Sequence, residues 1–329
     1  MTPEFDVVGV GLNATDTLLM VPRFPPYAGK ARILEEVLSP GGQVASALVA
    51  CARLGLRARY VGTVGDDDGG RIQVESLRAA GIDLEHVRVR EGCANQSAYI
   101  VIDQSTGERT IFWRRDDCLR IDPEAITSEQ VASGRLLLID GHDTAAVARA
   151  AELARAHGIP VVVDVDTIYP GFDRVLPNVD YLVASSEFPT AWTGEPDPFR
   201  ALEQIQNRYG MKVAAMTLGA EGALARYEET FAYSPAFVVN CVDTTGAGDV
   251  FHGAFCYAVL EGMPMRAALE FSNAMAALNC TAVGARGGIC GPEAVRALVA
   301  RGERRVHPDI AARAVAQASL PVSPLFRNL

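Results

Sequence analysis

The sequence predicts an α/β fold in which a mostly parallel sheet is covered by helices on both faces. Short apolar runs alternate along the chain with segments of helical periodicity. Strands that alternate with helices of about 10 to 15 residues are typical of parallel sheets joined by helical crossovers. Several of the runs are apolar throughout, which indicates strands buried on both faces. The central sheet is therefore expected to form the core of the protein.

The individual elements follow from these patterns. In the first predicted helix, apolar residues recur at 44, 45, 48, 49 and 52, which is a helical period. Two further helices are each followed by a glycine, Gly81 and Gly158, as is common at helix C-termini. Strands are expected at residues 5–10, 58–64, 136–140, 160–165, 181–184 and 211–217. Helices are expected at residues 43–54, 70–80, 144–157, from 249 onward and 264–278.

Residues 17–38 and 86–113 interrupt this alternation. Both contain alternating apolar and polar residues without a helical period, and the runs 99–103 and 109–113 flank a loop containing Gly107. That pattern is typical of a β-hairpin. We expect both regions to form one small β-sheet that stands off the main domain. The expected domains are a core of residues 1–16, 39–85 and 114–301, the small sheet of residues 17–38 and 86–113, and a C-terminal helix and tail of residues 302–329.

Composition excludes several classes of protein. The net charge of −10 argues against non-specific binding to nucleic acids, which requires a basic face. No apolar run approaches the roughly 18 residues that span a bilayer, so no membrane association is expected. Glu4 and Asp6 stand where a secretion signal would carry basic residues, which favours a cytoplasmic location. The seven cysteines are odd in number and contain no CxxC pair, so we expect all of them to be reduced.

The segment from Asp243 to Asp249 carries the clearest chemical signal. Gly246 and Gly248 flank Ala247 directly before a strongly apolar helix pattern, which places unpaired backbone N–H groups at a helix N-terminus. Such an end binds anions. Asp249 would lie beside the bound anion, where a carboxylate can take a proton from an attacking hydroxyl. The alternative is a tight turn in which Asp249 only complements the helix dipole.

With the apolar residues after it, this segment (residues 243–255, DTTGAGDVFHGAF) resembles the C-terminal signature of the ribokinase-like (PfkB) carbohydrate kinases. Residues 41–55 resemble the N-terminal signature of that family, a Gly-Gly pair opening a helix that ends in Arg-Leu-Gly. Residues 61–69 resemble its VGxxGxDxxG loop, and residues 8–16 its first strand with the following Asp. The resemblance spans residues 5 to about 290 and implies a ribokinase-like fold with a β lid over the sugar.

The resemblance implies an ATP-dependent kinase for a small sugar, a ketohexose or pentose such as fructose or ribose, with Mg²⁺ as a cofactor. Asp249 would be the general base, and the amides of Gly246, Ala247 and Gly248 would stabilise the transferring phosphoryl group. A nucleoside kinase of the same fold is one alternative. A non-catalytic sugar or nucleotide sensor is another, although a sensor need not keep the base. The family lid often pairs between protomers, so a homodimer through the lid is also expected.

A monovalent cation is expected next to this segment. Asp243 and Thr245 match positions at which family members hold K⁺, together with carbonyl groups of a later loop that would fall between Cys280 and Ile289. A fixed cation would add positive potential where negative charge develops. The resemblance therefore implies activation by K⁺ over Na⁺. The structural alternative is that Asp243 forms an Asx turn.

The nucleotide is expected at a TLGxxG loop. Its residues are Thr217, Gly219 and Gly222. Asn273 falls where the family places a residue beside the adenine, or else is an exposed polar residue of a helix. Glu187 matches the acid of an Asn-x-x-Glu pattern that organises Mg²⁺ and phosphate, but Ala184 stands at the Asn position. A helix-capping role for this cluster is the alternative.

The sugar is expected near the two glycines at 41 and 42 and at the carboxyl ends of the strands. The candidate residues are Asn13, Asp16, Gly41, Gly42, Gln43, Ser46, His142 and Asp166. Ser46 stands where the family often has Asn, which puts ribose itself in doubt. Asp164 is an alternative to Asp166, and either residue could instead cap a loop; His142 could be structural. The pair Arg114-Arg115 would either reach an anionic substrate group or be a solvated strand end.

Overall fold

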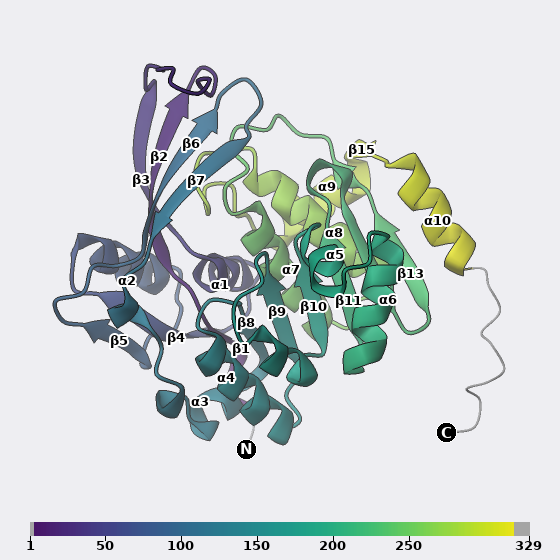
Figure 1. The fold of residues 1–329 in the computed structure, drawn as a ribbon, viewed down its shortest axis with the longest axis horizontal. Coiled ribbons are helices and arrows are strands. Elements are labelled where there is room, and N and C mark those ends of the chain that lie inside the picture. Colours follow the sequence, from purple (N-terminus) through teal and green to yellow (C-terminus); the bar gives the residue numbers. More distant parts are fainter. Residues whose placement is uncertain (1–2, 319–329) are drawn as a thin grey trace.

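A computed structural model of the chain describes residues 3–318. A nine-stranded sheet runs through its centre in the order β13-β12-β11-β10-β9-β8-β1-β4-β5, and a separate four-stranded sheet, β3-β2-β6-β7, stands beside it (Figure 1). In this large sheet, neighbouring strands are parallel from the β5 edge as far as β11, whereas β12 and β13 are antiparallel to their neighbours. The mostly parallel sheet and the small separate sheet confirm the predicted fold class.

The strands of the large sheet are β1 Phe5–Val10, β4 Ala58–Gly65, β5 Val87–Arg90, β8 Gly134–Ile139, β9 Val161–Val165, β10 Tyr181–Ala184, β11 Val213–Thr217, β12 Ala223–Tyr227 and β13 Thr230–Ser234. Those of the small sheets are β2 Ala14–Val21, β3 Glu35–Gly41, β6 Ser97–Asp103, β7 Arg109–Arg114, β14 Ala236–Phe237 and β15 Arg304–Arg305. The helices are α1 Gln43–Arg53, α2 Asp68–Ala79, α3 Ser128–Ala132, α4 Thr144–Ala156, α5 Phe188–Thr193, α6 Pro198–Tyr209, α7 Ala247–Leu260, α8 Met265–Asn279, α9 Pro292–Arg301 and α10 Pro308–Ala318.

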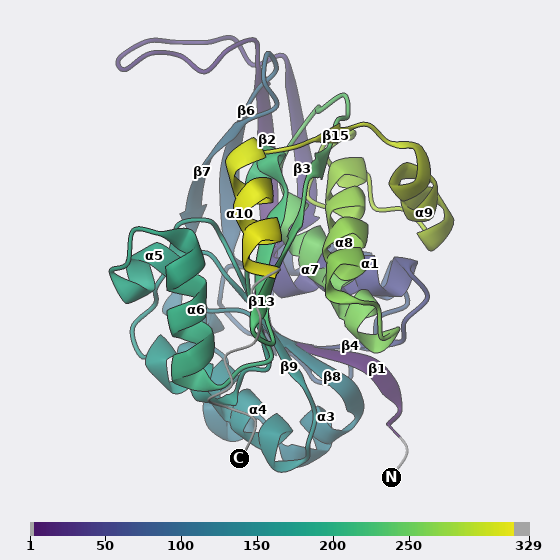
Figure 2. The same ribbon diagram turned by 90° about the vertical axis from the view of Figure 1, so that its right-hand side faces the viewer.

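Helices cover both faces of the large sheet, as Figure 2 shows. Apolar residues of α3, α4, α5, α6 and α10 pack against one face. Apolar residues of α1, α2, α7 and α8 pack against the other, and α9 packs outside α8. Within the large sheet, the next strand after β1 is β4, which pairs with one side of β1. Strand β8 later pairs with the other side of β1. A parallel sheet opens a ligand crevice at such a switch point, beyond the carboxyl ends of its strands.

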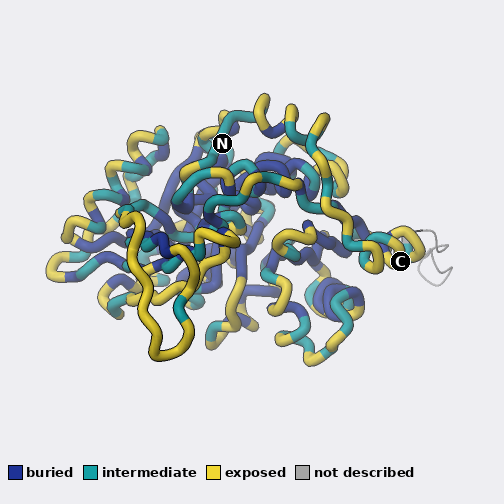
Figure 3. Tube along the Cα trace, turned by 90° about the horizontal axis from the view of Figure 1, so that it is seen from above, coloured by how far each residue is buried: buried dark blue, intermediate teal, exposed yellow. Residues whose placement is uncertain are grey.

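The small sheet is joined to the large sheet by a short connection, because only residues 11–13 separate β1 from β2. Its inner face carries buried apolar side chains, among them Leu18, Ile100 and Ile102. The connection between β2 and β3 is a long exposed loop, drawn in yellow in Figure 3. Of the predicted C-terminal segment, α10 is described, and residues 319–329 lie outside the described residues.

The β12–β13 hairpin and helix α6 were not predicted from the sequence. The hairpin turn carries Glu228 in a left-handed conformation (φ 49°), where glycine or asparagine is usual, so it gave no turn signal. The start of α6 had a readable signal, because the Asp197 side chain caps the helix and Pro198 occupies its first position.

The expectation that all cysteines are reduced is wrong for two of them. Cys93, which lies between β5 and β6, and Cys118, which follows β7, form a disulfide. The bond links the segment before β6 to the segment after β7, and therefore closes the base of the small sheet. The five other cysteines are free. In the described part of the chain, no helix is both long and apolar enough to cross a bilayer.

Candidate active site

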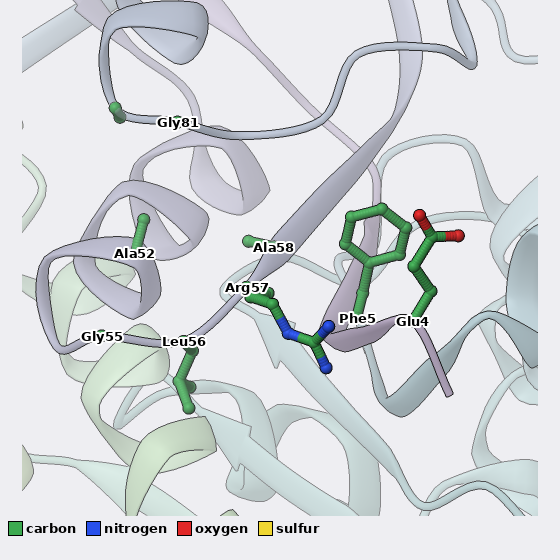
Figure 4. A pocket seen from close by; sticks show the side chains of 9 residues that line it. Glu4, Phe5, Ala52, Gly55, Leu56, Arg57, Ala58 and Gly81 are labelled. Carbon is green, nitrogen blue, oxygen red and sulfur yellow. The ribbon is translucent and has the colours of Figure 1, made fainter. Parts of the chain in front are cut away.

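The carboxyl ends of the core strands, the N-terminus of α7 and the small sheet lie at the same edge of the large sheet (Figure 1). This is where a parallel sheet is expected to have its ligand crevice. A hollow of about 290 Å³ lies elsewhere, at the amino ends of β1 and β4, where it is lined by Phe5, Arg57 and Ala58 among others (Figure 4). It is therefore at the opposite edge of the sheet from α7 and does not belong to this site.

Helix α7 begins with backbone amides that face the crevice. Its N-cap, Gly246, has a positive φ of 73°, and a Cβ there would lie 2.6 Å from Ala285 Cα, so glycine is required. Ala247 N donates to Thr244 O at 3.2 Å, which removes one of the three amides expected to bind the anion. Within the described chain, the amides of Gly248 and Asp249 have no hydrogen-bond acceptor, and Gly248 faces open space. The helix end therefore offers amides to an anion.

Asp249 lies in the first turn of α7. Burial raises the pKa of its carboxyl group to about 6. Within that net value, the guanidinium groups of Arg109 and Arg286 act to lower the pKa, and the carboxylates of Asp166 and Asp140 act to raise it. A carboxylate with a pKa near 6 is mostly ionised at neutral pH and is a stronger base than an exposed aspartate. It can accept a proton beside the anion-binding amides.

Asp16 enters the crevice from β2 in the small sheet. Burial, with the nearby charge of Asp249, raises the pKa of its carboxyl group to about 7. Gly41 admits this side chain, because a Cβ at Gly41 would collide with the Asp16 carboxylate. Gly42 is the N-cap of α1, with φ 90°, and a Cβ there would collide with the backbone of Asn13. The glycine pair thus leaves room for the strand that carries Asp16.

The other predicted sugar-binding side chains near the glycine pair form hydrogen bonds within the protein. Asn13 Nδ2 donates to Tyr60 Oη at 2.8 Å and to Thr63 O at 2.6 Å, so it holds β4. Ser46 is fully buried, and its hydroxyl accepts a hydrogen bond from Arg286 Nε at 3.2 Å. Gln43 lies at the crevice, with its Nε2 3.4 Å from Asp164 Oδ1. Among the residues that the structure describes, Asn13 Oδ1 and Gln43 Oε1 are buried without a hydrogen-bond partner, so these two side chains each keep an oxygen that could bind a ligand.

Arg286 was not predicted as a site residue. It donates to Gly41 O and to Ser76 Oγ, at 2.8 Å each, and to Gln73 Oε1 at 3.1 Å. Burial lowers the pKa of its guanidinium to about 10. The residue therefore fixes the glycine pair to α2 and places a positive charge near both Asp16 and Asp249. Sequence analysis treated its loop only as a source of carbonyl groups.

His252 and Asp164 form a second arrangement that sequence analysis missed as a pair. The two ring nitrogens of His252 lie 2.7 Å from Gly248 O and 3.0 Å from Val183 O. Its Nδ1 is also 3.2 Å from Asp164 Oδ2. Burial raises the pKa of Asp164 well above its ordinary value. The His252 ring lies between the first turn of α7 and β10, and among the described residues Asp164 Oδ2 is buried without a hydrogen-bond partner.

Asp166, by contrast, is exposed after β9 and close enough to Asp249 to raise its pKa. His142 lies at the same edge, where its ring packs on Tyr169 at 4.8 Å and edge-on to Trp113 at 6.2 Å. Trp113 on β7 is paired across the sheet with Ala98, and Ala98 with Asp16. Because paired residues point to the same face of a sheet, the side chains of Trp113 and Asp16 both lie on the inner face. An aromatic cluster therefore borders the crevice.

The predicted arginine pair is not free to bind an anion. Arg114 forms an exposed ion pair with Asp116. Arg115 donates to Asp143 at 2.5 Å and to Leu119 O at 3.0 Å. Both guanidinium groups are thus engaged by groups of the protein itself.

The predicted nucleotide residues lie at the far end of the crevice. Thr217 ends β11, and Gly219 and Gly222 follow it with positive φ angles of 56° and 103°. Glu187 is exposed after β10, and its carboxylate does not cap α5. Asn273 is buried rather than exposed. Its Nδ2 lies within 3.3 Å of three oxygens of Ser234 and Pro235, so its donors are committed to the protein.

The lid sheet touches the anion-binding segment. Arg109 Nη1 donates to Thr244 Oγ1 at 2.9 Å, and Thr244 N donates to Gly107 O at 3.2 Å. The turn between β6 and β7 is therefore docked on the segment that precedes α7. Free amides at a helix N-terminus, a carboxylate in the first turn and a small sheet docked beside them are an arrangement that suits phosphoryl transfer to a hydroxyl.

Comparison with known proteins agrees with this chemistry. The model of the pfkB family of carbohydrate kinases matches residues 5–290. The ATP-dependent ribose-1-phosphate kinase of Halopiger xanaduensis is 29% identical over 284 residues, which cover 85% of this chain and 93% of that protein. The crystal structure of a putative ribokinase from Agrobacterium tumefaciens is 32% identical and superposes with a TM-score of 0.83, covering 90% of this chain and 97% of the other. A putative Ribokinase II from E. coli in complex with ATP and Mg²⁺ has the same fold, at 23% identity and a TM-score of 0.77 over 90% of this chain and 99% of that one.

The chain therefore belongs to the pfkB family of carbohydrate kinases, and it is a sugar kinase. The family resemblance predicted from the sequence is confirmed.

Proposed function

We propose that the protein transfers the γ-phosphoryl group of ATP to a hydroxyl of a small neutral sugar, a ketohexose or a pentose. One observation carries this proposal. Asp249, with a pKa near 6, lies in the first turn of α7 beside the unpaired amides of Gly248 and Asp249 itself, and the Asp16 carboxylate enters the same crevice from the lid.

In the proposed reaction, Asp249 takes the proton of the acceptor hydroxyl as its oxygen attacks the γ-phosphorus. The free amides at the start of α7 stabilise the charge on the transferring group. Asp16, whose two oxygens can accept hydrogen bonds from neighbouring hydroxyls, orients the sugar. Asp166 and Gln43 are further acceptor-side candidates. The lid excludes water and so limits futile hydrolysis.

Thr217, Gly219 and Gly222 are proposed to border the nucleotide, where glycine allows close approach of the backbone. The described residues contain no cluster of three acidic, histidine or cysteine side chains suited to a metal ion. Glu187 is exposed at the end of β10 and fits a contact to Mg²⁺ through water. Bound with the phosphates, Mg²⁺ would supply charge neutralisation.

The charges around the crevice favour a neutral acceptor. Arg114 and Arg115 are paired with carboxylates of the protein. The carboxylates of Asp16 and Asp166 would repel an anionic group placed between them. A phosphorylated or acidic sugar is therefore expected to be a poorer substrate.

A nucleoside acceptor is the second candidate, and the aromatic cluster favours it. Trp113, His142 and Tyr169 gather at the edge of the crevice, and the Trp113 side chain is 57% exposed. Such rings can stack on a nucleobase, although they can equally cover the apolar face of a sugar.

We also propose that the protein forms a homodimer through the outer face of the lid. Leu38, Thr17, Tyr99 and Phe112 form one row across that face. Leu38, Tyr99 and Phe112 are each 57–58% exposed. An apolar row of this kind is unusual on a monomer surface. The cytoplasmic location expected from the sequence stays a prediction, which cell fractionation would test.

The first experiment is ADP release with ATP and Mg²⁺ across a panel of acceptors: ribose, fructose, tagatose, psicose, 2-keto-3-deoxygluconate, fructose 6-phosphate and adenosine. We expect one neutral sugar to give a strong signal that Asp249→Asn abolishes. A dominant signal with adenosine would favour the nucleoside candidate. A dominant signal with fructose 6-phosphate or the keto acid would contradict the neutral acceptor.

A further inference from the structure

The two segments expected to hold a monovalent cation do meet in the structure, but N–H groups donate to both carboxylate oxygens of Asp243 and to the carbonyl oxygens of Thr245 and Ala285. Asp243 Oδ1 accepts a hydrogen bond from Thr245 N at 2.8 Å. Its Oδ2 accepts one from Gly284 N, also at 2.8 Å. Asp243 is completely buried. Its carboxylate thus closes an Asx turn and fastens the later loop, which is the structural alternative to a cation ligand.

The carbonyl groups of the two segments are joined by a side-chain amide. Asn279, the last residue of α8, is completely buried. Its Nδ2 donates to Thr245 O at 3.2 Å and to Ala285 O at 3.1 Å. Its Oδ1 accepts a hydrogen bond from Gly288 N at 3.2 Å. Both N–H bonds of the amide are used, and each goes to a different segment.

A cation that bound both of these carbonyl groups would need the space that Asn279 Nδ2 fills. The surrounding backbone leaves little room for it to move, because a Cβ on Gly246 would lie 2.6 Å from Ala285 Cα and a Cβ on Gly288 would lie 2.6 Å from Asn279 Cα. A cation would also face two N–H groups with the same sign of charge. Among the described side-chain oxygens of these two segments, Thr245 Oγ1 is buried without a partner, but one side-chain oxygen does not make the multi-oxygen shell of a hard cation.

We propose that the Asn279 amide takes the structural place of a monovalent cation in this kinase, so that the protein needs neither K⁺ nor Na⁺. The proposal replaces the K⁺ activation expected from the sequence, and it rests on the proposed function only for its kinetic part. The amide holds the segment before α7 against the loop after α8, as an ion would. Positive charge beside the anion-binding amides comes instead from the lid, where Arg109 contacts Thr244 at 2.9 Å.

The test compares the protein in KCl, NaCl and choline chloride at equal ionic strength, with two readouts. The first is the melting temperature, which does not require a known substrate. The second is ADP release with the best acceptor. For the unmodified protein we expect the same melting temperature and the same kcat in all three salts. A higher melting temperature or rate in KCl than in choline chloride would overturn the proposal.

Asn279→Ala removes the amide and leaves a cavity beside the carbonyl oxygens of Thr245 and Ala285. We expect its kcat in choline chloride to fall by about tenfold or more, and K⁺ to restore both kcat and the melting temperature. Asn273→Ala is the matched control, because Asn273 is also buried on α8 and donates to backbone oxygens, but of Ser234 and Pro235. Its melting temperature should fall without a specific response to K⁺.

This design distinguishes failure of the proposed function from failure of the proposal for Asn279. If no acceptor is phosphorylated, the proposed function fails, while the melting temperatures in the three salts still decide the role of Asn279. If Asn279→Ala does not fold, Asn279→Ser is used, and the salt comparison of the unmodified protein remains decisive. Loss of stability in Asn279→Ala that no cation restores, together with K⁺ activation of the unmodified protein, would contradict the inference.

Discussion

At the scale of single residues, the site depends on carboxylates that are held close together. Burial raises the pKa of Asp249 to about 6 and that of Asp16 to about 7. Groups with raised pKa values favour the folded state most at low pH and lose that contribution as the pH rises through the raised pKa. At neutral pH, where Asp249 is mostly ionised and Asp16 about half ionised, the two residues therefore lower the stability of the fold, which is a common property of functional sites.

We expect Asp249→Asn to lower kcat by at least about 100-fold, because the amide cannot take the proton of the acceptor. The melting temperature should stay the same or rise, since a neutral amide is less costly to bury than a carboxylate. Steady-state ADP release and a thermal melt measure the two effects. Near-normal turnover would remove Asp249 from the role of base.

The pH dependence should follow the ionisation of the same residue. Because the base must be ionised, kcat/KM should fall as the pH drops below about 6, the pKa of Asp249. Asp166→Asn should move this midpoint to lower pH and Arg109→Gln to higher pH, since Asp166 raises and Arg109 lowers the pKa. Rate profiles between pH 5 and 8 would measure the shifts. Identical midpoints in all three proteins would mean that another group controls the acid limb.

Residue roles were only partly predictable from the sequence. Asp249 and Asp16 could be proposed from the sequence because each belongs to a local motif. Arg286 and His252 could not, because their partners lie far away in the sequence: Arg286 contacts Gly41, and His252 contacts Val183. Ser46 and Asn273 were assigned to ligands by position, but each is hydrogen-bonded inside the protein. No local pattern shows such long-range pairing.

At the scale of secondary structure, periodicity was a better guide. Buried strands such as β1 and β10 have the bounds that their apolar runs predicted. The predicted helix 43–54 differs from α1 by one residue. The disulfide between Cys93 and Cys118 was missed because the spacing of two cysteines does not show that a β-sheet will bring them together.

The contribution of the Cys93–Cys118 disulfide to the stability of the protein can be measured. Its two cysteines are 25 residues apart in the sequence, and closing a loop of this length stabilises a protein by about 3 kcal/mol. We expect Cys118→Ser, and equally the reduced protein, to melt at a lower temperature. Calorimetry with and without dithiothreitol measures this, and the reductant should have no further effect on the variant. Equal melting temperatures for the oxidised protein and the variant would show that the bond does not stabilise the fold.

At the scale of the whole molecule, the outer face of the lid predicts the assembly state. If that face pairs two copies, the protein should have twice the mass of the 35.1 kDa chain. Phe112→Glu places a charge in the middle of the apolar row and should yield monomers. Light scattering after size-exclusion chromatography measures both. A dimer that survives Phe112→Glu would have its interface elsewhere.

The lid also has a consequence for the order of events in the crevice. One hydrogen-bonded sheet carries Asp16 on β2 and Arg109 on β7, so a movement that withdraws one residue also withdraws the other. In the proposed reaction Asp16 orients the acceptor, and Arg109 contacts Thr244 in the segment proposed to bind the phosphoryl group. Whatever fixes the sheet at one end therefore improves binding at the other. By reciprocity, we expect each substrate to tighten the binding of the other by the same factor through this sheet.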